Sequence, residues 1–261
     1  MSDPFDLGEV PDDPVKRAQL HAKPELPRRF YAAADVAAVD GGFAVRLDGR
    51  QTRTPAGHPV VLPARAIAEA LAAEWNAQGT HIDPAGMPMS RLVNIALDGV
   101  AAAPEKVVDD IVAYAGSDLL CYRPAGPDGH LALIARHWDP VVAWAETRLG
   151  ARPVLAEGLM PVAQPAALTD AVRRALPAGP PLLVAALQSL TSLSGSALLA
   201  LAVHDGHLDI DAAWAAASVD EDWNASLWGA DAEAERHRAR RAAEARAAAL
   251  VVAALTRTDP R

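Results

Sequence analysis

The chain has 261 residues, of which 51% are apolar, and a formal net charge of −9. This length and apolar content allow it to bury a substantial core and to fold unaided. The negative charge argues against nucleic acid as the main partner, because phosphate binding requires a basic surface.

The start of the chain, residues 1–26, is rich in proline and acidic residues and shows little periodicity. It is predicted to form a mobile arm. It has neither the apolar stretch of a secretion signal nor the arginine-rich composition of a mitochondrial transit peptide, so we expect the protein to act in the cytoplasm.

Residues 27–100 are predicted to form a small β-rich domain. Phe43, Val45 and Leu47 alternate with smaller or charged residues, which is typical of a strand. Asp48-Gly49 follows directly and predicts a two-residue hairpin turn, because both central positions of that turn need a positive φ. Residues 51–54 supply the expected returning strand.

A helix is predicted to begin at Pro63, where the missing N–H of proline costs no hydrogen bond. Ile67, Leu71 and Trp75 recur every four residues and share one face of this helix. A segment rich in proline and glycine, residues 83–88, then separates the β-rich domain from the rest.

Residues 101–261 are predicted to form a larger α-helical domain, which makes the protein α+β in class. Alanine-rich stretches are broken at glycine and proline clusters throughout this region. Pro181 to Val203 is too often interrupted by polar residues to be a stable membrane span, so no membrane insertion is expected and the stretch is predicted to be one buried core helix. Asp231 to Leu255 is predicted to be a helix, with acidic residues first and arginines later, an order that suits the helix dipole and favours a charged outer face over a basic docking surface.

Several sequence features that could support catalysis or metal binding have simpler explanations. Cys121 is the one cysteine and is flanked by apolar residues, so a packed thiol is favoured over a nucleophile. The cluster Thr191 to Ser196 lacks the two glycines of a nucleophile elbow, and Gly195 is predicted to lie in mid-helix. His204 and His207 could offer two metal ligands, but Asp205-Gly206 between them is also a good helix C-terminal turn. We therefore expect no catalytic residue, cofactor or metal.

The most unusual local chemistry is the acidic, tryptophan-containing segment Val219 to Gly229. If it is helical, Val219, Trp223 and Leu227 share one face, while Asp220, Glu221 and Asp222 point elsewhere. The three acids could simply complement the N-terminus of a helix. The alternative is a protein-docking surface in which tryptophans are the anchors and the acids surround them. Its members would be Asp220, Glu221, Asp222, Trp223 and Trp228.

Several segments, taken together and in order, resemble the mitochondrial and α-proteobacterial assembly chaperones of the F1 part of ATP synthase that are associated with its alpha subunit. The segments span residues 28–230. They are Arg28 to Tyr31, Leu47 to Arg50, Arg53 to Pro55, Ala73 to Trp75 with Met87, Asp118 to Arg123, Trp138 to Pro140 with Trp144 to Glu146, and Trp228-Gly229.

The resemblance implies a β-rich N-terminal domain, a helical C-terminal domain and no catalytic residues or cofactor. It implies that the protein holds an unassembled alpha subunit until a beta subunit replaces it. An acidic residue before the Trp-Gly pair is a feature of the family, and Asp220, Glu221 and Asp222 are all candidates. This chain departs from the family pattern at Asn224 to Ser226 and in its alanine- and arginine-rich end.

Two alternatives to this function remain open at the level of sequence. The first is a non-catalytic binding module for another oligomeric protein. The second is a serine hydrolase that uses Ser194 or Ser196 with His137 or His204. We expect a monomer, because an assembly factor needs its binding surface for its client.

Overall fold

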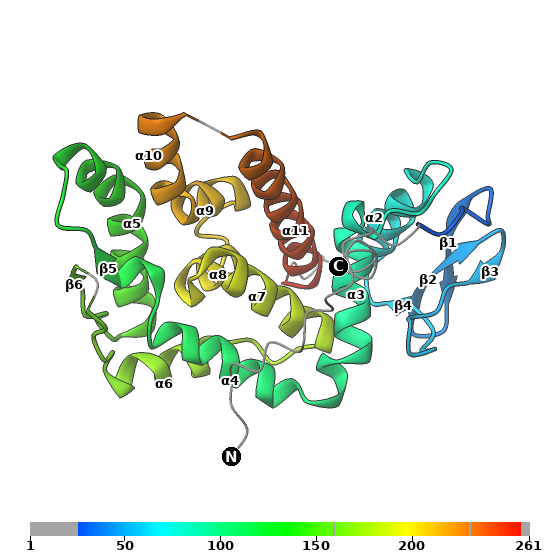
Figure 1. The fold of residues 1–261 in the computed structure, drawn as a ribbon. Helices are drawn as coiled ribbons and strands as arrows, with labels where there is room; N and C mark the ends of the chain where they lie inside the picture. The colour runs from blue at the N-terminus through cyan, green and yellow to red at the C-terminus, as the bar shows by residue number, and fades with distance from the viewer. Residues whose placement is uncertain (1–25, 159, 230, 257–261) are drawn as a thin grey trace, which may run out of the picture.

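The computed structural model describes residues 26–158, 160–229 and 231–256. All but the last residue of the predicted N-terminal arm lies outside this range. The described part begins with a small antiparallel sheet and continues as helices, which confirms the α+β class (Figure 1). The sheet lies at one end of the molecule and helices α5 and α6 lie at the other.

The sheet is built around its second strand. β2 (Gly42–Leu47) pairs with β1 (Ala34–Val39) along its whole length, and with the short strands β3 (Arg50–Gln51) and β4 (Val61–Leu62) along its other edge. Asp48 and Gly49 have φ values of 48° and 78°, which confirms the predicted hairpin turn.

Helix α2 (Arg65–Asn76) packs against β1 and β2 and buries Ile67 and Leu71 almost completely, as the periodicity predicted. The helix begins two residues later than expected. Pro63 lies outside it because the backbone of Ala64, with φ −128° and ψ 138°, is extended. Ala64 is therefore the N-cap.

One helix was missed entirely by the sequence analysis. After the short 3-10 turn η1 (Pro84–Gly86), α3 (Pro88–Asp98) runs through the last part of the region that was predicted to be β-rich. Its first residue is a proline, which is well tolerated there. α3 packs against both α2 and the later helices α7 and α11, so it joins the sheet region to the helical region.

Two helices form the centre of the helical region, α7 (Pro181–Ser194) and α8 (Ala197–His204). The prediction of one helix over residues 181–203 is wrong. Gly195 lies between the two with a φ of 71°, a left-handed conformation that ends α7 rather than a mid-helix position. Ser196 then caps α8 by accepting a hydrogen bond from the N–H of Leu199 at 3.0 Å.

Most of the other helices pack against this pair. In chain order the remaining elements are η2 (Val100–Ala102), α4 (Pro104–Ala115), η3 (Leu119–Cys121), α5 (Asp128–Leu149), α6 (Ala166–Ala175), α9 (Ile210–Ala217), α10 (Val219–Trp228) and α11 (Ala232–Thr256). Two strands of two residues each, β5 (Tyr122–Arg123) and β6 (Ala156–Glu157), form a parallel pair that the sequence analysis did not predict.

The sheet region and the helices share one core. Buried apolar side chains from Tyr31 near the start to Val252 near the end form a single contiguous cluster. Among the described residues, every helix is too short or too polar to cross a membrane.

Candidate functional site

Helix α10 carries all five residues of the predicted docking surface, and it ends in an exposed apolar tip. Trp228 is 85% exposed and its neighbour Leu227 is 53% exposed, whereas Val219 at the other end of the helix is buried. The predicted apolar face is therefore only half buried. Gly229, with a φ of 84°, ends the helix directly after Trp228.

The three acidic residues of α10 each contact a different cationic or imidazole side chain. The Oδ1 atom of Asp220 lies 2.8 Å from Nε2 of His130 in α5, and Oε1 of Glu221 lies 2.8 Å from Nη1 of Arg241 in α11. Asp222 forms an ion pair with Arg238, also in α11. These contacts hold α10 between α5 and α11.

The acids nevertheless remain accessible to a partner protein. Their side chains are each about half exposed, between 49% and 51%. All three lie in the first turn of α10, so they also complement its dipole. The structural explanation of the acids and the docking explanation are therefore compatible.

Trp223 and Trp228 have different environments. The ring of Trp223 stacks on the imidazole of His130, with a centroid distance of 5.3 Å and an interplanar angle of 2°. It also lies against Gly129, where a Cβ atom would come within 3.1 Å of the indole. Trp223 thus secures α10 to α5, and Trp228 is the tryptophan that a partner can reach.

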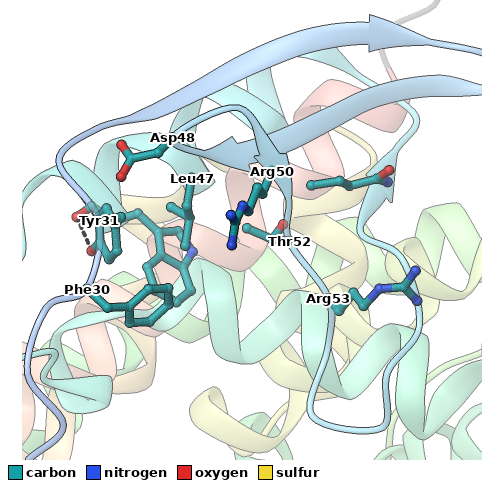
Figure 2. Close-up of a pocket in the computed structure, with 9 residues that line it drawn as sticks. Phe30, Tyr31, Leu47, Asp48, Arg50, Thr52 and Arg53 are labelled. Atoms are coloured by element: carbon teal, nitrogen blue, oxygen red, sulfur yellow. Dashed lines mark hydrogen bonds between the residues drawn. The ribbon is translucent and has the colours of Figure 1, made fainter.

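A second surface feature lies in the sheet region and was not singled out by the sequence analysis. It is an open cleft of about 570 Å³ beneath the β2–β3 hairpin, called here the hairpin cleft (Figure 2). Its lining comes from the segment before β1, from the hairpin and from α2: Phe30, Tyr31, Leu47, Asp48, Arg50, Gln51, Thr52, Arg53 and Trp75.

Three buried or partly buried carboxylates hold elements of the fold together. Glu74 of α2 accepts hydrogen bonds from the N–H groups of Met89 and Ser90, at 2.5 and 2.8 Å, and so caps α3. Asp98 accepts hydrogen bonds from Thr54 and from the N–H of Ala56, which fixes the loop between β3 and β4. These hydrogen bonds, led by that of Thr54, lower the pKa of Asp98.

The third carboxylate, Asp118, is fully buried. Its oxygens accept hydrogen bonds from the N–H groups of Leu120 and Leu198, both at 3.1 Å. Burial raises its pKa to about 6, against the opposing effect of these hydrogen bonds. Cys121 is also buried, which raises the pKa of its thiol to about 12 and confirms the packed thiol that the sequence predicted.

The residues weighed for hydrolysis are engaged in structural contacts. Ser196 is buried and caps α8, and the hydroxyl of Ser194 donates to the carbonyl of Leu190 at 2.7 Å. Among the described residues, neither serine hydrogen-bonds to a histidine. This arrangement does not favour the hydrolase alternative, because a serine nucleophile needs a base within hydrogen-bonding reach.

The pair considered for metal binding likewise has other contacts. His207 stacks on Trp144 with a centroid distance of 4.9 Å, and Nδ1 of His204 lies 2.8 Å from Asp205. Asp205 in turn pairs with Arg148 at 2.6 Å. Gly206 has a φ of 71°, as expected for the helix-ending turn predicted at this position.

The buried polar groups of this protein therefore stabilise the fold, and its exposed aromatic residues are of the type that contacts other proteins in interfaces. The comparisons with known proteins then identify its family. The family model for the ATP12 chaperone protein matches residues 28–146.

Two solved structures are similar over most of the chain. The Atu1473 protein of Agrobacterium tumefaciens, a candidate chaperone, is 46% identical, with a TM-score of 0.82, over 93% of this chain and 91% of its own. Atp12 from Paracoccus denitrificans is 37% identical, with a TM-score of 0.77, over 87% of this chain and 97% of its own. The chain belongs to the ATP12 chaperone family, which confirms the resemblance found in the sequence.

The structure separates the segments that carry this resemblance into two groups. Some of their side chains have a clear role in the fold: the Tyr31 hydroxyl donates to the carbonyl of Trp75, and the Trp138 Nε1 donates to the carbonyl of Ala216, both at 2.7 Å. Phe30, Arg50 and Trp228, by contrast, are exposed. Phe30 and Arg50 lie in the hairpin cleft, and Trp228 lies at the tip of α10.

Proposed function

We propose that this protein is a chaperone for assembly of the F1 sector of ATP synthase, and that it binds the unassembled alpha subunit until the beta subunit replaces it. Membership of the ATP12 chaperone family supports the assembly role. In this role the protein acts as a monomer in the cytoplasm. It acts by binding alone, without a catalytic residue or cofactor.

The observation that carries the proposal is the exposed tip of α10. A tryptophan that is 85% exposed beside a leucine that is 53% exposed loses contact with water when a partner covers it, and burial of such side chains contributes strongly to binding. The half-exposed carboxylates of Asp220, Glu221 and Asp222 lie on the same helix. Together they form the proposed contact surface for the alpha subunit.

An unassembled subunit needs a binding partner that shields its exposed interface. A subunit interface is an apolar surface that aggregates while it is exposed. A chaperone that covers part of it with an apolar anchor and a charged surround protects it, and the larger native interface with the beta subunit can then displace the chaperone.

The experiment is capture of separately expressed alpha and beta subunits by the tagged full-length chain. We expect selective capture of alpha, with at least tenfold weaker capture by a Trp228→Ser variant. Met160→Ser is the matched control, because Met160 is also highly exposed, at 78%, but lies outside α10. Equal capture of alpha and beta would favour a general binding module, and capture of neither would reject the proposal.

A further inference from the structure

The hairpin cleft combines an aromatic surface with two exposed arginines, Arg50 and Arg53. The rings of Phe30 and Tyr31 meet edge to face at 5.3 Å, and those of Tyr31 and Trp75 do so at 5.5 Å. Tyr31 is buried, but Phe30 at the end of this series is 74% exposed. An exposed phenylalanine supported by two further aromatic rings is a preformed apolar contact point.

Arg50 is the side chain of the cleft that is best placed to bind a ligand. It lies on the short edge strand β3 and is exposed, and within the described part of the chain its guanidinium has neither an ion pair nor a hydrogen bond. Figure 2 shows it pointing into the cleft, opposite Phe30. Arg53, further along the same edge, makes one hydrogen bond through its guanidinium among the residues that the structure describes, to the carbonyl of Gly57 at 2.7 Å.

Among the described residues, the one carboxylate in the lining, Asp48, forms no ion pair with Arg50. Both oxygens of Asp48 accept hydrogen bonds from the backbone: Oδ1 from Ala32 and Ala33, and Oδ2 from Ala32, at 3.0 to 3.1 Å. These bonds lower the pKa of Asp48, and the charge of Arg50 contributes to that lowering. The arginine that could compete for it, Arg29, instead donates to the backbone carbonyls of residues 31, 32, 76 and 78. The cleft is therefore a basic site on a protein whose net charge is −9.

We propose that the hairpin cleft is a second docking site for the client, and that it binds an extended segment with an aromatic or large aliphatic side chain next to one or more carboxylates. The apolar side chain would pack on Phe30 and Trp75, and the carboxylate would receive hydrogen bonds from the planar guanidinium of Arg50. Charge complementarity selects an acidic segment over a basic or neutral one. The identity of the client rests on the function proposed above; the chemistry of the cleft does not.

The first arm of the test measures the affinity of the full-length protein for isolated alpha subunit. We expect an Arg50→Glu variant to bind at least tenfold more weakly. Arg174→Glu is the matched control, because Arg174 is also exposed but lies on α6, away from both surfaces. We expect the affinity of this control variant for the alpha subunit to change less than twofold. If wild type and Arg50→Glu bind alpha equally, the cleft proposal is overturned while the function proposed above stands.

The second arm needs no client. A fluorescein-labelled peptide, Gly-Asp-Phe-Glu-Asp-Leu-Gly, is titrated with the full-length chain and compared with a peptide in which Asn and Gln replace the acids. We expect saturable binding of the acidic peptide, loss of binding with Arg50→Glu, and no binding of the amide peptide. Peptide binding that is absent or unaffected by Arg50→Glu overturns the proposal, even if alpha is captured through α10. Peptide binding without alpha capture supports the cleft and rejects the proposed function.

Two further experiments distinguish the client from two other occupants of the hairpin cleft, namely the protein's own N-terminal segment and a second copy of the chain. The segment around Phe5 in this chain, with Asp3 and Asp6, has the same chemistry as the proposed ligand. If Phe5→Ser in the full-length chain strengthens peptide binding, the occupant is the protein's own N-terminal segment and the client proposal is overturned. A dimeric sedimentation mass that Arg50→Glu reduces to that of a monomer would assign the cleft to a second copy, with the same consequence.

Discussion

The Oδ2 atom of Asp118 accepts a hydrogen bond from the N–H of Leu198, a residue 80 positions away, in the fully buried centre of the helical region. Its other oxygen accepts from the N–H of Leu120. One carboxyl group thus joins the segment before β5 to the first turn of the central helix α8. We therefore expect this carboxyl to contribute to the stability of the protein and to the dependence of that stability on pH.

We expect Asp118→Asn to destabilise the protein, because one oxygen acceptor becomes an N–H donor that faces a backbone donor, at a cost of about 1–3 kcal/mol. The pKa of Asp118 is raised to about 6 by burial, above its ordinary 3.8. Its stabilising contribution is therefore complete below about pH 4 and is lost as the pH rises through 6, by about 3 kcal/mol in all. Urea unfolding at pH 4.5 and 7.0 measures the free energy of unfolding of both proteins. The difference in this free energy between wild type and variant should be larger at pH 4.5 than at pH 7.0. An equal difference at both values would mean that this carboxyl does not titrate in that range.

Two adjacent glycines connect β1 to β2: Gly41 lies in the turn and Gly42 is the first residue of β2. At Gly42, an added Cβ would overlap the carbonyl oxygen of Leu62 in β4, whereas at Gly41 it would meet nothing within 4 Å. Both residues have a positive φ, 85° at Gly41 and 149° at Gly42. We expect Gly41→Ala to cost about 1 kcal/mol from backbone strain and Gly42→Ala about 1–3 kcal/mol more from the overlap. Equal melting temperatures for the two variants would contradict this account of the turn.

The ion pair between Asp222 and Arg238 allows the structural and docking roles of the acids to be separated. Asp222→Ala and Arg238→Ala remove the same pair, but only the first removes the acid that a client could contact. If the acid binds the client, we expect Asp222→Ala to weaken capture of the alpha subunit about three- to tenfold and Arg238→Ala to leave it nearly unchanged. Equal losses in the two variants would show that Asp222 acts by holding α10 in place.

Cys121 is expected to be inert in the folded protein. Burial raises the pKa of its thiol to about 12, so the reactive thiolate is scarce at neutral pH. A thiol reagent such as dithionitrobenzoate should label it within seconds in 6 M guanidinium chloride but only slowly under native conditions. Rapid labelling of the native chain would show that this region of the core opens readily.

The sequence was sufficient wherever a local rule decides the structure. Alternation predicted β2, the Asp48-Gly49 pair predicted a turn in which both residues have a positive φ, and four-residue spacing predicted the buried face of α2. Prediction from the sequence failed where two local rules compete for the same residues. Proline and glycine before Pro88 suggested a linker and hid α3, and the apolar run around Gly195 suggested one helix although the glycine adopts the conformation that ends it.

The site shows the same division between local and distant contacts. Local spacing could place Asp220, Glu221 and Asp222 in the first turn of a helix, and this is confirmed. Their partners His130, Arg238 and Arg241 lie between 16 and 90 residues away, so only the folded chain reveals them. The hairpin cleft was missed for a related reason, because its lining comes from three separate segments that look like ordinary turn and helix residues in the sequence.

The way in which α10 is attached has a consequence for its motion. Val219 is its only fully buried residue, and its remaining attachments are largely the contacts of three half-exposed acidic side chains and the stacking of Trp223 on His130. Little apolar burial is lost when such a helix separates from its neighbours, so α10 should open locally long before the central helices unfold. Its backbone amides should exchange with solvent deuterium much faster than those of α7, and bound client should slow them selectively. The helix proposed to hold an unassembled subunit would then gain part of its own order from that subunit.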